Sequence, residues 1–170
     1  DNYLEMEGLV YKVTFEESSS TTSMPRLNYD RMVQNITEAP DSSQLIVIPD
    51  DYRDHINAGY GIYRYTNLDN PDVYFNENIQ RLIQNYRSSF LQLGLQNLYS
   101  SDEDGKANTL EILDKMDDYF PQNVIPTTDA ELDIQIGRIY MQAGKPEELK
   151  NRLKEVQKRK DVSLETQMYI

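Results

Sequence analysis

The amino-acid sequence predicts a mainly α-helical fold, in which antiparallel helix pairs follow an N-terminal mixed segment of strands and loops. From Asn76 onward, apolar residues recur every three or four positions, as in amphipathic helices, whereas earlier residues alternate or are broken by polar turns. The tripeptide Gly144–Pro146 joins two helical segments and is too short for anything but a tight antiparallel hairpin. We therefore divide the chain into residues 1–75 and 76–170, and expect them to form one compact unit.

The clearest helix pair lies between Asp129 and Lys160. The apolar face of its first helix carries Leu132, Ile136, Ile139, Tyr140 and Ala143. Gly144 supplies the left-handed residue that ends this helix, and Pro146 stands in the first turn of the next, where its missing N–H is least costly. The inner face of the second helix carries Leu149, Leu153 and Val156.

This helix pair resembles a tetratricopeptide repeat. Ile136–Gly137 falls at the Leu-Gly position of that repeat, and Tyr140 and Gly144 fall at its Tyr and Gly positions. The resemblance implies that Gly137 lets the partner helix approach and that Tyr140 fills the space between neighbouring pairs. The chain departs from the repeat's Trp, Ala and Pro at Asp133, Leu149 and Asp161. An ordinary helical hairpin is the alternative.

A second copy of this pattern is centred on Leu93 and Gly94. These residues correspond to Ile136 and Gly137 at a spacing of 43 residues, longer than the repeat's usual 34 or so. A third copy would begin in residues 162–170. Because a helix pair of this type cannot bury its apolar face alone, we expect neighbouring pairs to stack.

Two further helices are expected before the Asp129–Lys160 pair. The first runs from Asn76, its N-terminal cap, to about Tyr99, with an inner face of Ile79, Leu82, Ile83, Tyr86, Phe90 and Leu93. The second ends at Pro121 and has an inner face of Ala107, Leu110, Leu113, Met116 and Phe120. Thr128 or Asp129 then caps the next helix.

Residues 1–75 predict strands and one short helix. Alternation over residues 9–15 indicates a strand with Leu9, Tyr11, Val13 and Phe15 on one face. The apolar run 45–48 is a candidate buried strand and a candidate partner for the first. Residues 28–37 predict a short helix capped by Asn28.

Composition excludes several classes of function. The net charge of −12 argues against a nucleic-acid partner, because phosphate repels an acidic protein. The absence of cysteine excludes disulfides and thiolate chemistry. No apolar run approaches the roughly 20 residues that span a bilayer. Residues 145–160 are basic, which is typical of a solvated helix face, although a patch near anionic headgroups is the alternative.

No catalytic, metal-binding or cofactor-binding residue stands out. His55 is the single histidine and lies in a polar stretch. The acidic stretches 69–72 and 101–105 lack the glycine and glutamate positions of a calcium-binding EF-hand loop. The triplet Asn35–Thr37 fits the N-glycosylation pattern, which often occurs by chance.

Tyrosines provide the one candidate binding surface in the N-terminal segment. A tyrosine offers ring area with a polar tip, so a cluster of them can line a peptide or sugar site. The alternative is a partly buried loop. The candidates are Tyr52, Tyr60, Tyr63 and Tyr65.

Two segments resemble a more particular family. They are Glu7–Val13, and the run from Tyr65 to Arg87 that includes Asn-Pro-Asp-Val-Tyr at 70–74. Followed by helix pairs, they resemble the C-terminal extracytoplasmic region of bacterial polytopic membrane proteins similar to protein O-mannosyltransferases. Residues 40–60 look like an insertion. Catalytic acids of such enzymes lie in the membrane portion, so the resemblance carries none onto this chain.

The resemblance implies a periplasmic location and a tether to the inner membrane. Because the chain opens at Asp1 and ends at Ile170 within a helical pattern, we expect both ends to continue into a longer protein. The first functional hypothesis is a non-catalytic accessory or binding domain of a membrane glycosyltransferase-like protein. Its partners would be the membrane portion of its own chain and a protein or glycan acceptor. The alternative is a free-standing scaffold of tetratricopeptide type.

Overall fold

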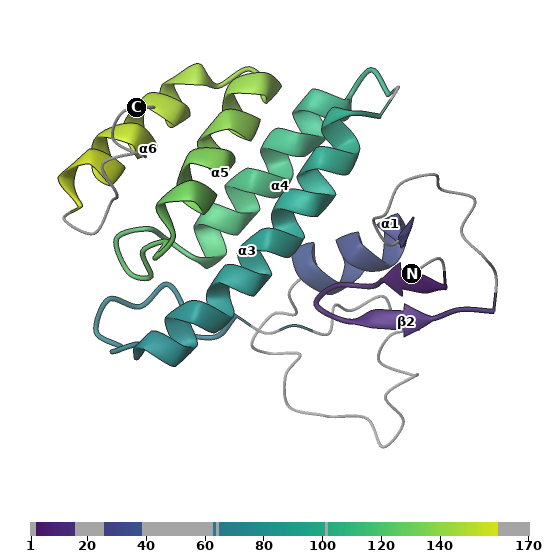
Figure 1. Ribbon diagram of the computed structural model, residues 1–170, viewed down its shortest axis with the longest axis horizontal. Helices are drawn as coiled ribbons and strands as arrows, with labels where there is room; N and C mark the ends of the chain where they lie inside the picture. The colour runs from purple at the N-terminus through teal and green to yellow at the C-terminus, as the bar shows by residue number, and fades with distance from the viewer. Residues whose placement is uncertain (1–2, 16–25, 39–62, 64, 101, 160–170) are drawn as a thin grey trace. The chain divides into compact units, whose positions relative to one another are not determined.

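The computed structural model describes residues 3–15, 26–38, 63, 65–100 and 102–159 (Figure 1). The chain divides into two compact units, Asp1–Asn67 and Leu68–Ile170. The sequence suggested one compact unit with an internal boundary after residue 75. The division falls earlier because the turn residues before Asn76 belong with the helices: the Phe75 carbonyl accepts a hydrogen bond from the Gln80 side chain at 2.9 Å.

The first unit contains a small mixed sheet. Strand β1 (Leu4–Met6) pairs antiparallel with β2 (Tyr11–Val13) and parallel with β3 (Arg26–Leu27), in the order β2-β1-β3. The turn between β1 and β2 contains Gly8 at φ 125°, a conformation that favours glycine.

The prediction of one strand over residues 9–15 is therefore wrong in extent. The amide of Glu7 donates to the carbonyl of Val10, so the residues before Tyr11 form a turn. The face that carries Val13 and Phe15 is not buried, since Val13 is 72% and Phe15 fully exposed. β2 is an edge strand among the described strands, and the buried apolar residue of this sheet is Met6 of β1.

Glu5 is a buried carboxylate at the centre of this sheet. Arg26 Nε donates to its Oε1 at 2.8 Å, and Asn28 Nδ2 donates to its Oε2 at 3.2 Å. Burial would raise the pKa of Glu5, but the hydrogen bonds from Asn28 and Arg26 and the charge of Arg26 outweigh it and hold the pKa below the ordinary value.

We expect Glu5 to make the first unit sensitive to acid. Because its pKa is lower when folded, its contribution is fully present above the unfolded pKa and is lost as the pH falls through the folded pKa. Thermal unfolding between about pH 6 and about pH 3 should therefore depend less on pH in Glu5→Gln than in the native protein. Glu103→Gln, at an exposed acid, is the matched control. Equal pH dependence in Glu5→Gln and the native protein would contradict this role.

A short helix follows the sheet, as predicted. Helix α1 (Tyr29–Met32) is capped by Asn28 and continues as the π-helix η1 (Val33–Thr37). Met32 and Ile36 are buried, as are Asn35 and Thr37 of the glycosylation triplet. Since Asn35 Nδ2 donates to the Glu7 carbonyl at 2.7 Å, this amide is engaged in the folded chain.

The second unit confirms the predicted fold class. It consists of α3 (Glu77–Leu98), α4 (Gly105–Tyr119), α5 (Ala130–Ala143) and α6 (Pro146–Lys158). Helices α3 and α4 form one antiparallel pair and α5 and α6 another, and α4 packs on α5, so the pairs stack side by side (Figure 1). The fold is thus mainly helical, with a small mixed sheet in the first unit.

The ends of these helices follow the sequence signals. Asn76 Oδ1 accepts from the Ile79 amide at 3.0 Å, and Asp129 Oδ1 accepts from the Glu131 amide at 2.9 Å. Gly144 adopts φ 113° after α5, and Pro146 opens α6. Asp129 rather than Thr128 is therefore the cap of α5.

The core of this unit lies between the helices. Its largest fully buried apolar side chains are Phe90, Leu93, Leu113, Met116, Phe120, Ile125, Ile136, Tyr140 and Val156. The rings of Phe90 and Phe120 meet edge to face, with centroids 6.0 Å apart.

Several residues assigned to inner faces are not buried. Ile79 is 39% and Leu82 is 52% exposed, because the 15-residue α4 is too short to accompany the first turns of the 22-residue α3. Ala107 is also exposed; besides Gly105, the buried residues of α4 are Thr109, Ile112, Leu113 and Met116. The predictions for residues 45–48 and 162–170 lie outside the described residues.

Candidate functional site

The residues predicted to pack the repeats lie on the first helix of each pair, α3 or α5, or at its C-terminal end. Leu93, Ile136 and Tyr140 are buried. Gly94 and Gly137 each lie against the second helix of their own pair, and Gly144 ends α5 in the left-handed conformation. The two pairs therefore place their glycines in equivalent positions.

The two helix glycines differ in how closely the partner approaches. A Cβ at Gly137 would lie 2.9 Å from Leu149 Cδ1 and 3.0 Å from Leu149 Cα. A Cβ at Gly94 would lie 3.7 Å from Thr109 Cγ2 and 3.8 Å from Leu113 Cδ2, an ordinary contact. Contact between α5 and α6 is thus tight at Gly137, where a Cβ would force Leu149 to shift, whereas contact between α3 and α4 leaves room for a methyl group at Gly94.

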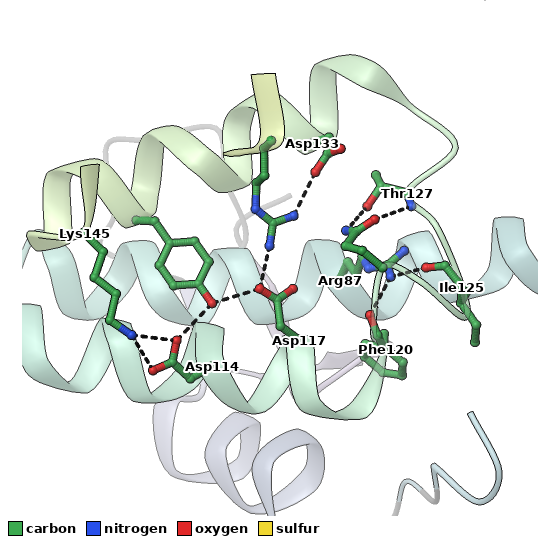
Figure 2. A network of polar contacts seen from close by, with 11 residues as sticks. Arg87, Asp114, Asp117, Phe120, Ile125, Thr127, Asp133 and Lys145 are labelled. Atoms are coloured by element: carbon green, nitrogen blue, oxygen red, sulfur yellow. Dashed lines mark hydrogen bonds and ion pairs between the residues drawn. The ribbon is translucent and has the colours of Figure 1, made fainter. Parts of the chain in front are cut away.

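A buried arginine joins three helices. Arg152 of α6 donates from Nη1 to Asp133 Oδ1 of α5 at 2.8 Å, and from Nη2 to Asp117 Oδ2 of α4 (Figure 2). The side chains of Arg152 and Asp133 are only 7% and 6% exposed. Burial opposes the charge of Arg152, but Asp117 and Asp133 outweigh it and raise the pKa of the guanidinium.

Tyr140 of α5 adds further polar contacts to the carboxylates of α4. Its hydroxyl lies 3.1 Å from Asp114 Oδ1 and 3.0 Å from Asp117 Oδ2, and Lys145 Nζ lies 2.7 Å from Asp114 Oδ2 (Figure 2). Burial and the two carboxylates raise the pKa of Tyr140, so the phenol remains a neutral donor. We call Arg152, Asp133, Asp117, Tyr140, Asp114 and Lys145 the arginine network.

Arg87 holds the connection between α4 and α5. This fully buried side chain donates from Nη2 to the carbonyls of Phe120, at 2.8 Å, and Ile125 (Figure 2). Burial lowers the pKa of Arg87 to about 10, so it is charged at neutral pH. Gln122 and Thr127 bridge the same connection with two hydrogen bonds, of 2.6 and 2.9 Å.

These polar contacts fix helices and connections. Each carboxylate of the arginine network is paired with a cation of a neighbouring helix or connection. Across the described residues, no group of three or more His, Cys, Asp and Glu side chains is arranged to hold a metal ion. In the same residues, none of the helices combines the length and apolarity needed to cross a bilayer.

Two of the four candidate tyrosines are described, and both form hydrogen bonds with backbone groups of the first unit. The Tyr63 hydroxyl accepts from the Leu9 amide at 2.8 Å, and the Tyr65 hydroxyl donates to the Ile36 carbonyl at 2.9 Å. Tyr52 and Tyr60 lie outside the described residues, as does His55.

Helix α3 exposes an uncharged polar stripe that the sequence analysis missed. Asn85, Gln92 and Gln96 are exposed, and their spacings of seven and four residues keep them on one side of the helix; Tyr99, the C-cap residue of α3, is also exposed. The Tyr99 hydroxyl lies 3.4 Å from Gln142 Oε1 of α5, which extends the stripe onto that helix. We call Asn85, Gln92, Gln96, Tyr99 and Gln142 the amide face.

The amide face lies in a stretch with little charge. Between Leu82 and Ser100 the one charged residue is Arg87, which is buried, whereas 27% of the whole chain is charged. Exposed helix faces of small proteins normally carry charge for solubility. This local lack of charge is the sequence signal that could have indicated the surface. For the arginine network, the sequence signal was the acidic residue Asp133, which stands where the tetratricopeptide repeat has a buried Trp.

The fold and these contacts define a mainly helical protein of stacked antiparallel helix pairs. No protein-family model, curated protein or solved structure matches the chain.

Proposed function

We propose that this chain is a non-catalytic accessory or binding domain of a membrane glycosyltransferase-like protein. The resemblance of residues 7–13 and 65–87 supports attachment to such a protein, on the periplasmic side and tethered to the inner membrane. The amide face supports a binding role. It is an exposed and uncharged set of hydrogen-bonding side chains, and the helices that carry it are packed against their neighbours.

The bracing matters because a rigid surface loses less conformational entropy on binding. Helix α3 packs on α4, and the arginine network ties α4 to α5 and α6 through contacts that are largely buried. The carboxylates of this network are already paired with cations, which supports a structural rather than a catalytic use of these acids.

The proposed partners are the membrane portion of the chain's own protein and a protein or glycan acceptor. Nucleic acid is an unsuitable partner for a chain of net charge −12. A free-standing scaffold of tetratricopeptide type is the second candidate, favoured by the equivalent glycines of the two pairs. Hydrophobic spans upstream in the full-length sequence would favour the first candidate, and their absence the second.

The proposed role is tested by deleting residues 68–170 from the intact membrane protein and measuring sugar transfer to its natural acceptor. We expect transfer to fall while the amount of protein in the membrane stays normal, because the acceptor is no longer held near the membrane portion. An intact protein carrying Lys154→Gln on exposed α6 is the control for surface changes. Full transfer by the deletion variant at normal protein level would rule out the binding role.

A further inference from the structure

We propose that the amide face binds an extended, uncharged polypeptide segment through its main chain. This inference rests on the proposed binding role and names the ligand class and the residues that contact it. The surface is formed by Asn85, Gln92 and Gln96 of α3, the C-cap residue Tyr99, and Gln142 of α5.

The hydrogen-bonding groups of this surface match a peptide main chain. An Asn or Gln side chain presents one carbonyl acceptor and an NH2 donor, so it can pair with the N–H and the C=O of a peptide group at once. An ionised carboxylate only accepts and a lysine only donates, so neither can do both. A row of side-chain amides is therefore suited to hydrogen-bonding with a peptide main chain.

The length of the stripe fits a short extended segment. Asn85 of α3 and the C-cap residue Tyr99 are 14 residues apart, which at about 1.5 Å per helical residue spans about 21 Å. At about 3.3 Å per residue, an extended segment of about six residues covers that distance. A linear row of side chains suits a linear ligand.

Charge and apolar neighbours define the segment further. Arg81 and Arg138 are exposed one turn before Asn85 and Gln142, so an acidic residue beside the segment is favoured and a basic one is disfavoured. Leu82, three residues before Asn85 on the same side of α3, is 52% exposed. It offers a contact to an aliphatic side chain, which a polypeptide has and a neutral glycan lacks.

The test measures binding of the whole chain to a pool of ten-residue peptides with blocked ends, drawn from Gly, Ser, Thr, Val and Leu. A second pool has the same side chains but N-methylated alternate peptide groups, which removes main-chain donors. The variant is Gln92→Glu with Gln96→Glu, which keeps side-chain size and removes the amide donors. The matched control is Asn151→Asp, an exposed amide-to-acid change on α6.

We expect the first pool to bind and the N-methylated pool to bind at least about tenfold more weakly, because several hydrogen bonds are lost. Gln92→Glu with Gln96→Glu should weaken binding of the first pool by a similar factor, and Asn151→Asp should not. Equal binding of both pools, no effect of the double variant, or binding of a neutral oligosaccharide in place of peptides would overturn the inference.

Failure of this inference is distinguishable from failure of the proposed function. If the intact protein needs residues 68–170 for transfer but tolerates Gln92→Glu with Gln96→Glu, the binding role stands and the amide face is not its site. If the deletion variant keeps full transfer, the proposed function itself falls.

Discussion

Arg152→Met is expected to lower the free energy of unfolding of the helical unit by about 3–5 kcal/mol. The substitution keeps an unbranched side chain of similar length but removes the cation that pairs with Asp133 and Asp117. Asp133 is buried, so among the described residues its carboxylate would be left with Arg159 Nη1 at 3.8 Å as a pairing cation. Urea unfolding monitored by circular dichroism measures the loss.

Two further variants check that the effect comes from the unpaired charge. Lys158→Met removes a cation of the same helix that pairs with Glu155, with both side chains about two-thirds exposed, and should change stability little. Asp133→Asn in the Arg152→Met background should restore part of the lost stability, because it removes the buried charge. Equal stability of Arg152→Met and Lys158→Met would contradict the role given to the arginine network.

Gly137→Leu is expected to destabilise the same unit by about 1–3 kcal/mol through overpacking. The first carbon of a side chain at this position would already lie 3.0 Å from Leu149 Cα, so a whole leucine side chain needs α5 and α6 to move apart. The melting temperature of the chain measures the effect.

The matched control is Gly94→Ala. A Cβ there meets α4 at ordinary contact distance, and alanine favours a helix interior by roughly 0.5–1 kcal/mol over glycine. We therefore expect Gly94→Ala to preserve or raise the melting temperature. An unchanged melting temperature in Gly137→Leu, or a large drop in Gly94→Ala, would contradict the packing described for the two pairs.

Local signals in the sequence were sufficient to place the helices of the second unit. Asn76, Asp129, Gly144 and Pro146 act within one turn of their own positions, so neighbouring residues reveal their roles. Most of the predicted apolar face of α5 is buried, whereas on α6 Val156 is buried and Leu149 and Leu153 are half-buried.

Features set by distant residues were not predictable in the same way. The exposure of Leu82 depends on the length of α4, and the exposure of Val13 depends on β2 being an edge strand. The arginine network joins Asp117 to Arg152, 35 positions later, and nothing in the sequence distinguishes Asp117 among 29 acidic residues. The amide face was missed because uncharged exposed side chains leave no catalytic or ligand motif.

We propose that this chain binds a partner without transforming it. Native mass spectrometry of the isolated chain, mixed with the natural acceptor and sugar donor of the intact protein, tests binding and chemistry together. We predict a complex of the chain with the acceptor in which both masses are unmodified. An acceptor that gains the mass of a sugar would contradict the claim, and so would the absence of any complex at concentrations where the intact protein is active.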